Sequence, residues 1–248
     1  MAKDYALKFK QALKRSGWMF VPNERTFLYR HLSAFAARLN YDLVLDVGAG
    51  MRQYKGLFVD YCYQSCDVED GFHSRQKHDF WASIYNIPKR DNLFDVVLML
   101  QVLEHLEFPL EGLKEVNRIL KQDGVVFLSV PQAAGDHFEP HHYFNFTQYG
   151  LKSVLEQAGF VITKHYRLAG MFAYVGNRIE KMGSLMVHQC KSRNIFLRVI
   201  ARLFLILCWT AAWIISRFNF LDKEKRYCIG HVVIARKEKH IAPVKRVG

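Results

Sequence analysis

The chain has 248 residues, 50% of them apolar, and carries a formal net charge of +12. This length and apolar content allow one α/β domain with a full core and exclude a disordered chain. The five cysteines are odd in number and include no Cys-x-x-Cys pair, which favours a reducing compartment over a disulfide framework. The amino terminus has no continuous apolar core, so we expect no secretory signal and a cytoplasmic location.

The first predicted elements are two helices. Apolar residues recur with helical spacing over residues 5–16 and 24–39, and Gly17 and Pro22 separate the two segments. We expect these helices to cover either the sheet or the mouth of a cofactor site.

An apolar strand follows and ends in the sequence Asp46-Val47-Gly48-Ala49-Gly50. Glycines at 48 and 50 permit a tight turn and let a ligand approach the backbone, at the strand end where open parallel sheets bind ligands. A dinucleotide fingerprint would have a third glycine at position 53, where this chain has Gln53. A nicotinamide or flavin dinucleotide is therefore disfavoured.

A second predicted strand, 61–65, leads into Asp67, which lies 17 residues beyond Gly50. An acid at this point is placed to accept hydrogen bonds from ribose hydroxyls. The alternative is that Asp67 only begins a turn with residues 69–71. Position alone does not decide between the two.

Strands and helices then alternate along the chain. Predicted strands cover 94–100, 125–130, 161–166 and 228–235, and predicted helices cover 110–121 and 148–158. Asp123-Gly124 is expected to form the turn before the strand at 125, Thr147 to cap the helix at 148, and Gly159 to end it. This alternation predicts a mostly parallel, doubly wound α/β sheet covered by helices.

Several segments after the glycine turn together resemble one enzyme family. They are Phe94-Asp95-Val96-Val97, Val102-Leu103-Glu104-His105, Asn117–Gly124 before a strand ending in Pro131, His141–Thr147, Gly150-Leu151 and Gly159-Phe160. With the turn and Asp67, they resemble the class I S-adenosylmethionine-dependent methyltransferases, in particular the bacterial branch associated with glycan and cell-surface biosynthesis. The resemblance covers residues 40–168 and the last strand near 228–236. It implies a Rossmann-like seven-stranded sheet with an antiparallel last strand, a helical insertion before that strand, and S-adenosyl-L-methionine as the cofactor.

The resemblance also implies which residues contact the cofactor. They are Asp46, Val47, Gly48, Ala49, Gly50, Tyr54, Asp67, Ser83, Ile84, Leu100 and Gln101. Ser83 stands where the family commonly has an acid near the adenine, which leaves the Ile84 backbone to serve there. Relatives that bind a divalent metal have Glu-x-x-Glu-His after the fourth strand, and here Gln101 replaces the first acid. We therefore expect no metal, with a site built from Glu104, His105 and His141 as the alternative.

The reaction that the resemblance implies is an in-line displacement, in which an acceptor attacks the sulfonium methyl group. A hydroxyl acceptor needs a base, and the pKa of histidine suits this task near neutral pH. His141 matches a family position, and Glu104 and His105 follow the fourth strand, so these three are the candidate catalytic residues. The alternative for His141 is that it only fastens the loop 132–147. His142 stands where relatives often have an acid.

Basic charge is concentrated at the carboxyl end: residues 175–248 contain 15 basic and 4 acidic residues, a net +11. The same region contains the apolar run 203–215, with two tryptophans, between Arg202 and Arg217. This combination predicts that residues 195–217 attach to an anionic membrane surface. Thirteen helical residues reach about 20 Å against about 30 Å of hydrocarbon, so we expect the helix to lie in the interface or to dip in and return. The alternatives are a buried core helix and a dimer interface.

These observations predict four regions: a helical cover (1–40), a methyltransferase core (41–174), a basic and apolar helical insertion (175–227), and the last strand with a basic tail (228–248). The expected function is O-methylation of a lipid-linked glycan, or of another amphipathic small-molecule acceptor, on the inner face of a membrane. An RNA methyltransferase would also be basic, but the charge here accompanies an apolar helix, so nucleic acid is not the expected partner. A non-catalytic subunit with the cofactor fold is the other alternative, because Ser83 and Gln101 depart from the family pattern.

Overall fold

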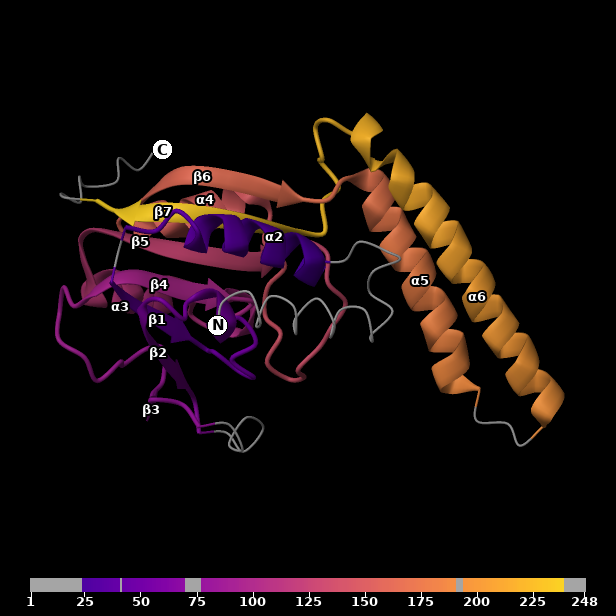
Figure 1. The fold of residues 1–248 in the computed structure, drawn as a ribbon, viewed down its shortest axis with the longest axis horizontal. Coiled ribbons are helices and arrows are strands. Elements are labelled where there is room, and N and C mark those ends of the chain that lie inside the picture. Colours follow the sequence, from indigo (N-terminus) through magenta and orange to yellow (C-terminus); the bar gives the residue numbers. More distant parts are fainter. Residues whose placement is uncertain (1–23, 41, 70–76, 191–193, 239–248) are drawn as a thin grey trace. The chain divides into compact units, whose positions relative to one another are not determined.

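The computed structural model describes residues 24–40, 42–69, 77–190 and 194–238 (Figure 1). The helix expected at 5–16 lies outside these residues. The chain divides into two compact units. Among the described residues, the sheet unit comprises 31–166 and 230–238, and the hairpin unit comprises 24–30 and 167–229.

A seven-stranded sheet, with strand order β3-β2-β1-β4-β5-β7-β6, organises the sheet unit. The strands are β1 (Leu43–Val47), β2 (Cys62–Asp67), β3 (Phe80–Trp81), β4 (Phe94–Leu100), β5 (Leu120–Pro131), β6 (Phe160–Leu168) and β7 (Gly230–Lys237). The pairs from β3 through β5 are parallel, and β7 runs antiparallel to β5. The predicted Rossmann-like fold, with an antiparallel last strand, is confirmed.

Helices cover both faces of this sheet (Figure 1). Alternate residues of β4 point to opposite faces, and Val97 and Met99 share one apolar core with residues of α3 (Pro109–Ile119) and α4 (Gln148–Gln157). On the opposite face, the second half of α2 (Glu24–Ala36) packs on β5, where the Phe35 and Phe127 rings lie 4.9 Å apart. Of the two predicted positions for this helix, on the sheet or at the cofactor mouth, the structure shows the first.

Most predicted elements are present with shifted ends. The N-terminal helix ends at Ala36 instead of 39, and α3 spans 109–119 instead of 110–121. β5 begins at Leu120 instead of 125, because Asp123 takes a left-handed φ of 65° and forms an irregularity inside the strand. The predicted cap is confirmed, since Thr147 Oγ1 accepts a hydrogen bond from Gly150 N at 3.1 Å. The two-residue β3 was not predicted.

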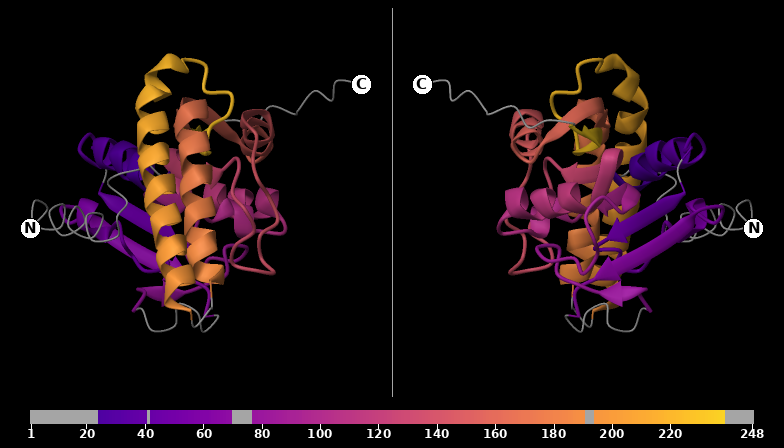
Figure 2. Two further views of the ribbon diagram at one scale, coloured as in Figure 1. Left: turned by 90° about the vertical axis from the view of Figure 1, so that its right-hand side faces the viewer. Right: turned by 90° about the vertical axis from the view of Figure 1, so that its left-hand side faces the viewer.

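The hairpin unit contains two long antiparallel helices, α5 (Met171–Gln189) and α6 (Ile195–Arg217), which run side by side (Figure 2). A short 3₁₀ turn, Phe218–Leu221, follows α6. The chain leaves and re-enters the sheet at one place, because Ile229 N donates to Leu168 O at 2.9 Å. The predicted helical insertion is therefore a hairpin between β6 and β7.

Small residues line the contact between α5 and α6. A Cβ added at Gly176 would lie 2.4 Å from Ser216 Oγ, and one at Gly183 would lie 2.7 Å from Cys208 Cβ. The buried residues of α6 are Ala201, Cys208, Ala212 and Ser216. The two helices thus approach so closely that larger side chains would not fit between them.

The large apolar side chains of α6 point away from this contact. Phe196 is 74% exposed and Leu207 is 63% exposed. By length and composition, Ile195–Leu221 is the single helical segment within the described ranges that could cross a membrane, and 22% of its apolar window is buried. A helix of 23 residues reaches about 34 Å, so the premise that the helix is too short to span was wrong. The alternative of a buried core helix was also wrong, because most of this surface is exposed.

Candidate active site

The glycine turn lies at the carboxyl end of β1, whose neighbours are β2 and β4. Gly48 and Gly50 have left-handed φ angles of 63° and 49°. A Cβ at Gly48 would come within 2.7 Å of the Val102 side chain, so this position requires glycine. Ala49 N donates to the carbonyl of the β2 residue Cys66 at 3.1 Å, and the side chain of Val47 is buried. The turn therefore offers backbone, rather than side chains, to a ligand.

Asp46 is buried beneath this turn. Its Oδ2 accepts a hydrogen bond from the hydroxyl of Tyr63 at 2.7 Å. Its Oδ1 is also buried and has no hydrogen-bond partner among the described residues. Burial raises the pKa of Asp46 to about 7, and the Tyr63 hydrogen bond opposes that rise. A donor group of a ligand could satisfy the remaining oxygen.

Asp67, at the end of β2, lies next to the glycine turn as the sequence predicted. Its Oδ2 accepts from Gly50 N at 2.7 Å, and its Oδ1 accepts from Val68 N at 2.8 Å. Because backbone donors hold both oxygens, the carboxylate has a fixed direction at the carboxyl edge of the sheet. Part of the alternative turn, residues 70 and 71, lies outside the described residues.

The segment that carries Ser83 and Ile84 follows β3 and is tied to Asp67, whose carbonyl accepts from Ala82 N at 2.9 Å. Ser83 Oγ accepts from Tyr85 N at 3.3 Å, so this hydroxyl stabilises the local turn. The Ile84 side chain is buried in the core beneath α3. The Ile84 side chain is therefore not available to a ligand, and contact through its backbone stays a prediction.

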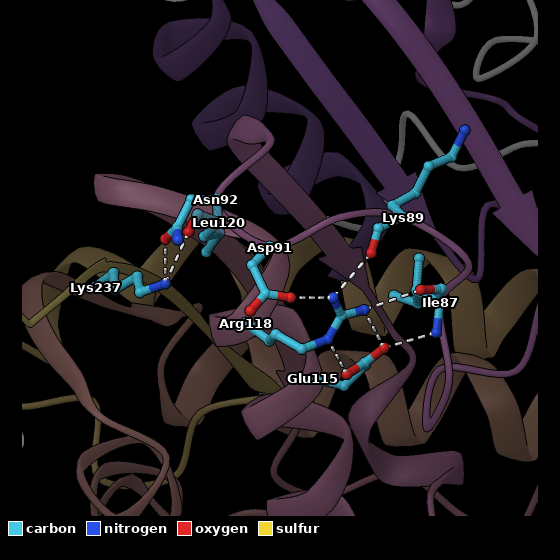
Figure 3. Close-up of polar contacts among 8 residues, drawn as sticks. All are labelled: Ile87, Lys89, Asp91, Asn92, Glu115, Arg118, Leu120 and Lys237. Carbon is cyan, nitrogen blue, oxygen red and sulfur yellow. Dashed lines mark hydrogen bonds and ion pairs between the residues drawn. The ribbon is translucent and has the colours of Figure 1, made fainter.

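Arg118 of α3 forms hydrogen bonds with residues 87–91, which follow Ser83 and Ile84 in the sequence (Figure 3). Its guanidinium donates to both oxygens of Glu115 at 2.7 and 2.8 Å and to Asp91 at 2.6 Å. It also donates to the carbonyls of Lys89 and Ile87, at 2.8 and 2.9 Å. The Arg118 hydrogen bond holds the pKa of Glu115 below its ordinary value. This network holds the chain after Ser83 and Ile84 against α3.

The end of β4 provides Leu100 and Gln101, which were predicted to contact the cofactor. Gln101 has a left-handed φ of 59°. Its backbone N–H donates to Ser129 O at 3.0 Å, and its Nε2 donates to Ser129 Oγ at 3.2 Å. The Gln101 side chain thus points along the sheet toward β5. Tyr54, on the segment after the glycine turn, is buried, and its carbonyl accepts from Leu57 N at 2.9 Å.

The three candidate catalytic residues lie together, at the ends of β4 and β5. Glu104 is fully buried, and its carbonyl accepts from Tyr143 N at 2.9 Å. His105 Nδ1 lies 2.6 Å from the carbonyl of His141, and its Nε2 lies 4.0 Å from Glu104 Oε1. The His141 ring is exposed, with Nδ1 3.4 Å from the Tyr143 hydroxyl. The backbone of His141 therefore fastens the loop, while its ring remains accessible.

Two further histidines, His137 and His142, complete a cluster that sequence reasoning did not find. The His137 ring centroid lies 4.9 Å from that of His105 and 4.4 Å from that of His142. Burial is the largest cause that lowers the pKa of His105, and the neighbouring imidazoles add to it. The spacing of His137 in the sequence carries no signal for this contact, which depends on how the loop folds back.

A comparison with family models decides the identity of this fold. A model described as a methyltransferase domain matches residues 23–165, more than half of the chain. The chain belongs to this family. It is an S-adenosylmethionine-dependent methyltransferase of class I, and the alternative of a non-catalytic subunit is disfavoured.

A curated relative and two solved structures are similar to parts of this methyltransferase. An uncharacterised protein from Methanocaldococcus jannaschii is 36% identical over 91 residues, which cover 36% of this chain and 40% of that protein. The [4+2]-cyclase SpnF has a TM-score of 0.51 at 18% identity, over 84% of this chain and 80% of its own. A candidate sarcosine dimethylglycine methyltransferase from Galdieria sulphuraria has a TM-score of 0.52 at 14% identity, over 86% of each chain. At 18% and 14% identity, the two solved structures show only that the fold is shared.

Proposed function

We propose that this methyltransferase O-methylates a lipid-linked glycan, or another amphipathic acceptor of the kind used in cell-surface biosynthesis, on the cytoplasmic face of a membrane. The observation that carries the proposal is the exposed apolar surface of α6. Its largest exposed apolar side chains are Phe196, Ile200, Leu203 and Leu207, each at least 60% exposed. A contiguous apolar surface of this kind marks a membrane or protein contact.

The small residues between α5 and α6 support a membrane as the partner. In lipid, apolar side chains gain nothing by turning inward, so helices associate through small residues that let their backbones approach. Gly176 and Gly183 of α5 meet Ala212 and Cys208 of α6 in this way. The hairpin is thus packed as membrane helices are packed, with its bulky side chains outside.

Basic and aromatic residues on α6 also support this proposal. Arg198 and Arg202 precede the apolar run, and their long side chains can extend to lipid headgroups while their stems lie on apolar surface. Arg217 follows the run, and its guanidinium lies 5.0 Å from the centre of the Trp213 ring. Tryptophan and arginine are typical of the membrane interface, and each basic residue near an anionic surface adds about 1 kcal/mol.

The sheet unit would hold the cofactor at the carboxyl ends of β1, β2 and β4. The bound cofactor supplies an electrophilic methyl group on its sulfonium. Asp46 Oδ1, buried without a partner among the described residues, fits a hydrogen bond from the ammonium group of the methionine part. Asp67 would accept from the ribose hydroxyls, and the Gly48 to Gly50 turn would lie against the methionine part. The adenine would meet the Ile84 backbone beside Ser83. Leu100, Gln101 and Tyr54 would contact other parts of the cofactor.

The acceptor hydroxyl would lose its proton to His141, whose ring is exposed at the carboxyl end of β5. Glu104 and His105 would bind the acceptor oxygen beside it. Because His141 is held through its backbone, which donates to Phe138 O at 2.9 Å and accepts from His105, its ring can be replaced without releasing the loop.

Flotation of the full-length protein with anionic phosphatidylglycerol vesicles tests membrane attachment. Wild-type protein should float, and flotation should weaken but persist in high salt, because salt screens charge but not apolar burial. The double substitution Ile206→Glu and Leu207→Glu changes two exposed positions and should abolish flotation. Tyr149→Glu, at a position 75% exposed on α4, is the matched control and should still float.

Two results would overturn this proposal. If wild-type protein stays at the bottom of the gradient and runs as a dimer that the double substitution dissociates, the hairpin is a dimer interface. If labelled methyl groups from S-adenosylmethionine appear in RNA rather than in the lipid fraction of a cell extract, the enzyme is an RNA methyltransferase. Label in an alkali-stable methyl ether of a lipid-linked sugar is the expected result.

A further inference from the structure

A buried carboxylate and three imidazoles meet where the segments after β4 and β5 fold against each other. Ligand atoms of Glu104, His105 and His137 all lie within 4.8 Å of one another. His142 adjoins them, with its ring centroid 4.4 Å from that of His137 and 5.9 Å from that of His105. All four residues belong to the sheet unit.

The hydrogen bonds of two of these histidines fix which nitrogen is free to bind an ion. A carbonyl oxygen can only accept, so a ring nitrogen bonded to one must carry the proton. His105 Nδ1 lies 2.6 Å from His141 O, and His137 Nδ1 lies 3.0 Å from Gly135 O. A neutral imidazole whose Nδ1 donates to a carbonyl carries its lone pair on Nε2. Histidines that bind metals are oriented in this way, with the second N–H donated to a carbonyl or carboxylate.

The side chain of the third histidine, His142, is buried without hydrogen bonds to its ring nitrogens in the described part of the chain. Its side chain is 4% exposed, and neither ring nitrogen has a hydrogen-bond partner among the described residues. Asp136 Oδ1 lies 3.5 Å from its Nδ1. Burying an imidazole without hydrogen bonds is costly, and a metal bond through one nitrogen would remove part of that cost.

We propose that Glu104, His105 and His137 bind one divalent transition-metal ion, with His142 as the fourth ligand. Three imidazoles and one carboxylate suit Zn²⁺, Fe²⁺ or Co²⁺, whereas Mg²⁺ and Ca²⁺ prefer oxygen ligands. Ligand atoms around Zn²⁺ at about 2.0 Å lie roughly 3.3 Å apart in a tetrahedron. The ligand atoms of Glu104, His105 and His137 would therefore close by up to about 1.5 Å, and the His142 ring would turn toward them. His137 is exposed and can make much of this movement.

This site differs from the one that the sequence argued against. The sequence disfavoured a metal because Gln101 replaces an acid, and its alternative set used His141. In the structure the His141 ring points elsewhere and its carbonyl orients His105. The nitrogen ligands come instead from His137 and His142.

The role of the ion deepens the proposed function and rests on it. An acceptor hydroxyl that reached the ion as a fifth ligand would have its pKa lowered. The binding of the ion itself does not depend on which acceptor is used.

Metal titration of the full-length protein, without a histidine tag and after treatment with a chelator, tests the proposal. We expect one Zn²⁺ per chain by calorimetry, and visible Co²⁺ absorption of the strength typical of four- or five-coordinate sites. His137→Ala should weaken binding by roughly 100-fold or more, and Glu104→Gln should do the same while thermal unfolding confirms that it folds. His188→Ala, at an exposed position on α5, is the matched control and should bind as wild type.

Binding of S-adenosylmethionine is measured in parallel, so that the two proposals can fail separately. If the protein binds S-adenosylmethionine but no Zn²⁺ or Co²⁺, the metal site is wrong and the cofactor site stands. If Zn²⁺ binding is unaffected by His137→Ala, or if Mg²⁺ binds in preference, the proposed ligands are also wrong. Metal binding lost in His137→Ala and kept in His188→Ala supports the site, whichever acceptor the enzyme methylates.

Discussion

Helices α3 and α6 place their apolar side chains in opposite ways. In α3 the buried residues include Leu113, Val116 and Ile119, and the charged side chains of Glu111 and Lys114 are exposed. In α6 the buried residues are alanine, cysteine and serine, and the bulky apolar residues are exposed. Burying one leucine side chain contributes about 1.5–3 kcal/mol in water, so a helix shaped by water alone would turn its leucines inward. Helix α3 of the sheet unit therefore buries most of its large apolar side chains, whereas α6 of the hairpin unit exposes most of its own.

The largest expected effect is on the rate of methyl transfer, because we propose that all catalytic residues belong to the sheet unit. His141→Ala should lower the rate of methyl transfer roughly 10²–10⁴-fold, because it removes the base for the acceptor hydroxyl. The rate is measured with labelled S-adenosylmethionine and the lipid fraction of a membrane extract. Cofactor affinity should stay unchanged, since His141 lies outside the cofactor turns. A wild-type rate would leave His141 with only its backbone role in the loop.

The next effect concerns the cofactor. Asp67→Ala should weaken S-adenosylmethionine binding by about 1.5–3 kcal/mol, because a hydrogen bond to a charged group is lost. Calorimetry measures this loss, and Asp60→Ala, at an exposed position on the segment before β2, is the control. Asp67→Asn separates two causes, since it keeps an oxygen for Gly50 N but removes the charge. Unchanged affinity in Asp67→Ala would remove this residue from the site.

A substitution at the contact between α5 and α6 tests whether the hairpin unit can be destabilised without affecting the sheet unit. Gly183→Leu would place a side chain where a Cβ already lies 2.7 Å from Cys208 Cβ. Overpacking of this kind costs about 1–3 kcal/mol, so the hairpin should unfold at a lower temperature in mild detergent. Ser184→Leu, at the exposed neighbouring position, should have little effect. If Gly183→Leu weakened S-adenosylmethionine binding by as much as it destabilised the hairpin, the two units would not be stabilised separately.

The smallest effect is a pH dependence that belongs to the sheet unit alone. Burial raises the pKa of Asp46 to about 7, above the roughly 3.9 of an unfolded aspartate. Between these values the folded state holds more protons than the unfolded state, so the free energy of unfolding falls as pH rises. The slope contributed by this proton is at most about 1.4 kcal/mol per pH unit.

Denaturant unfolding of the cofactor-free protein near pH 6 and near pH 7 measures this slope. Asp46→Asn cannot ionise and should flatten the difference between the two conditions. An Asp46→Asn protein with the wild-type slope would show that another group, and not this carboxyl, changes its protonation.

Local sequence signals predicted the sheet unit well. The glycine turn, Asp67 and the cap at Thr147 depend on neighbours in sequence or on the general geometry of parallel sheets, and each is found where expected. The first hairpin helix, α5, was not predicted as a separate element within the insertion 175–227, because Asn177, Arg178 and Glu180 interrupt its apolar pattern. The bounds of α6 match the predicted segment 195–217. Its capacity to span was underestimated, because only the apolar run 203–215 between Arg202 and Arg217 was counted.

The histidine cluster could not have been predicted from spacing. His137 is 32 residues from His105 in sequence, and their contact depends on the backbone of the loop 132–147. That loop is positioned by hydrogen bonds such as Tyr143 N to Glu104 O and Phe146 N to Pro131 O, both 2.9 Å. Such bonds follow from the tertiary fold and have no periodic signature in the sequence.

The hydrogen bond between Ile229 N and Leu168 O has a consequence for how the protein could be altered. It joins the two ends of the hairpin, and β6 and β7 are neighbours in the sheet, so the intervening segment is topologically a long loop between adjacent strands. A tight turn of a few residues can connect such strands. We therefore expect that the hairpin can be replaced by a short turn between β6 and β7 without changing the strand order. The same hairpin could be inserted between the corresponding strands of a relative that lacks it.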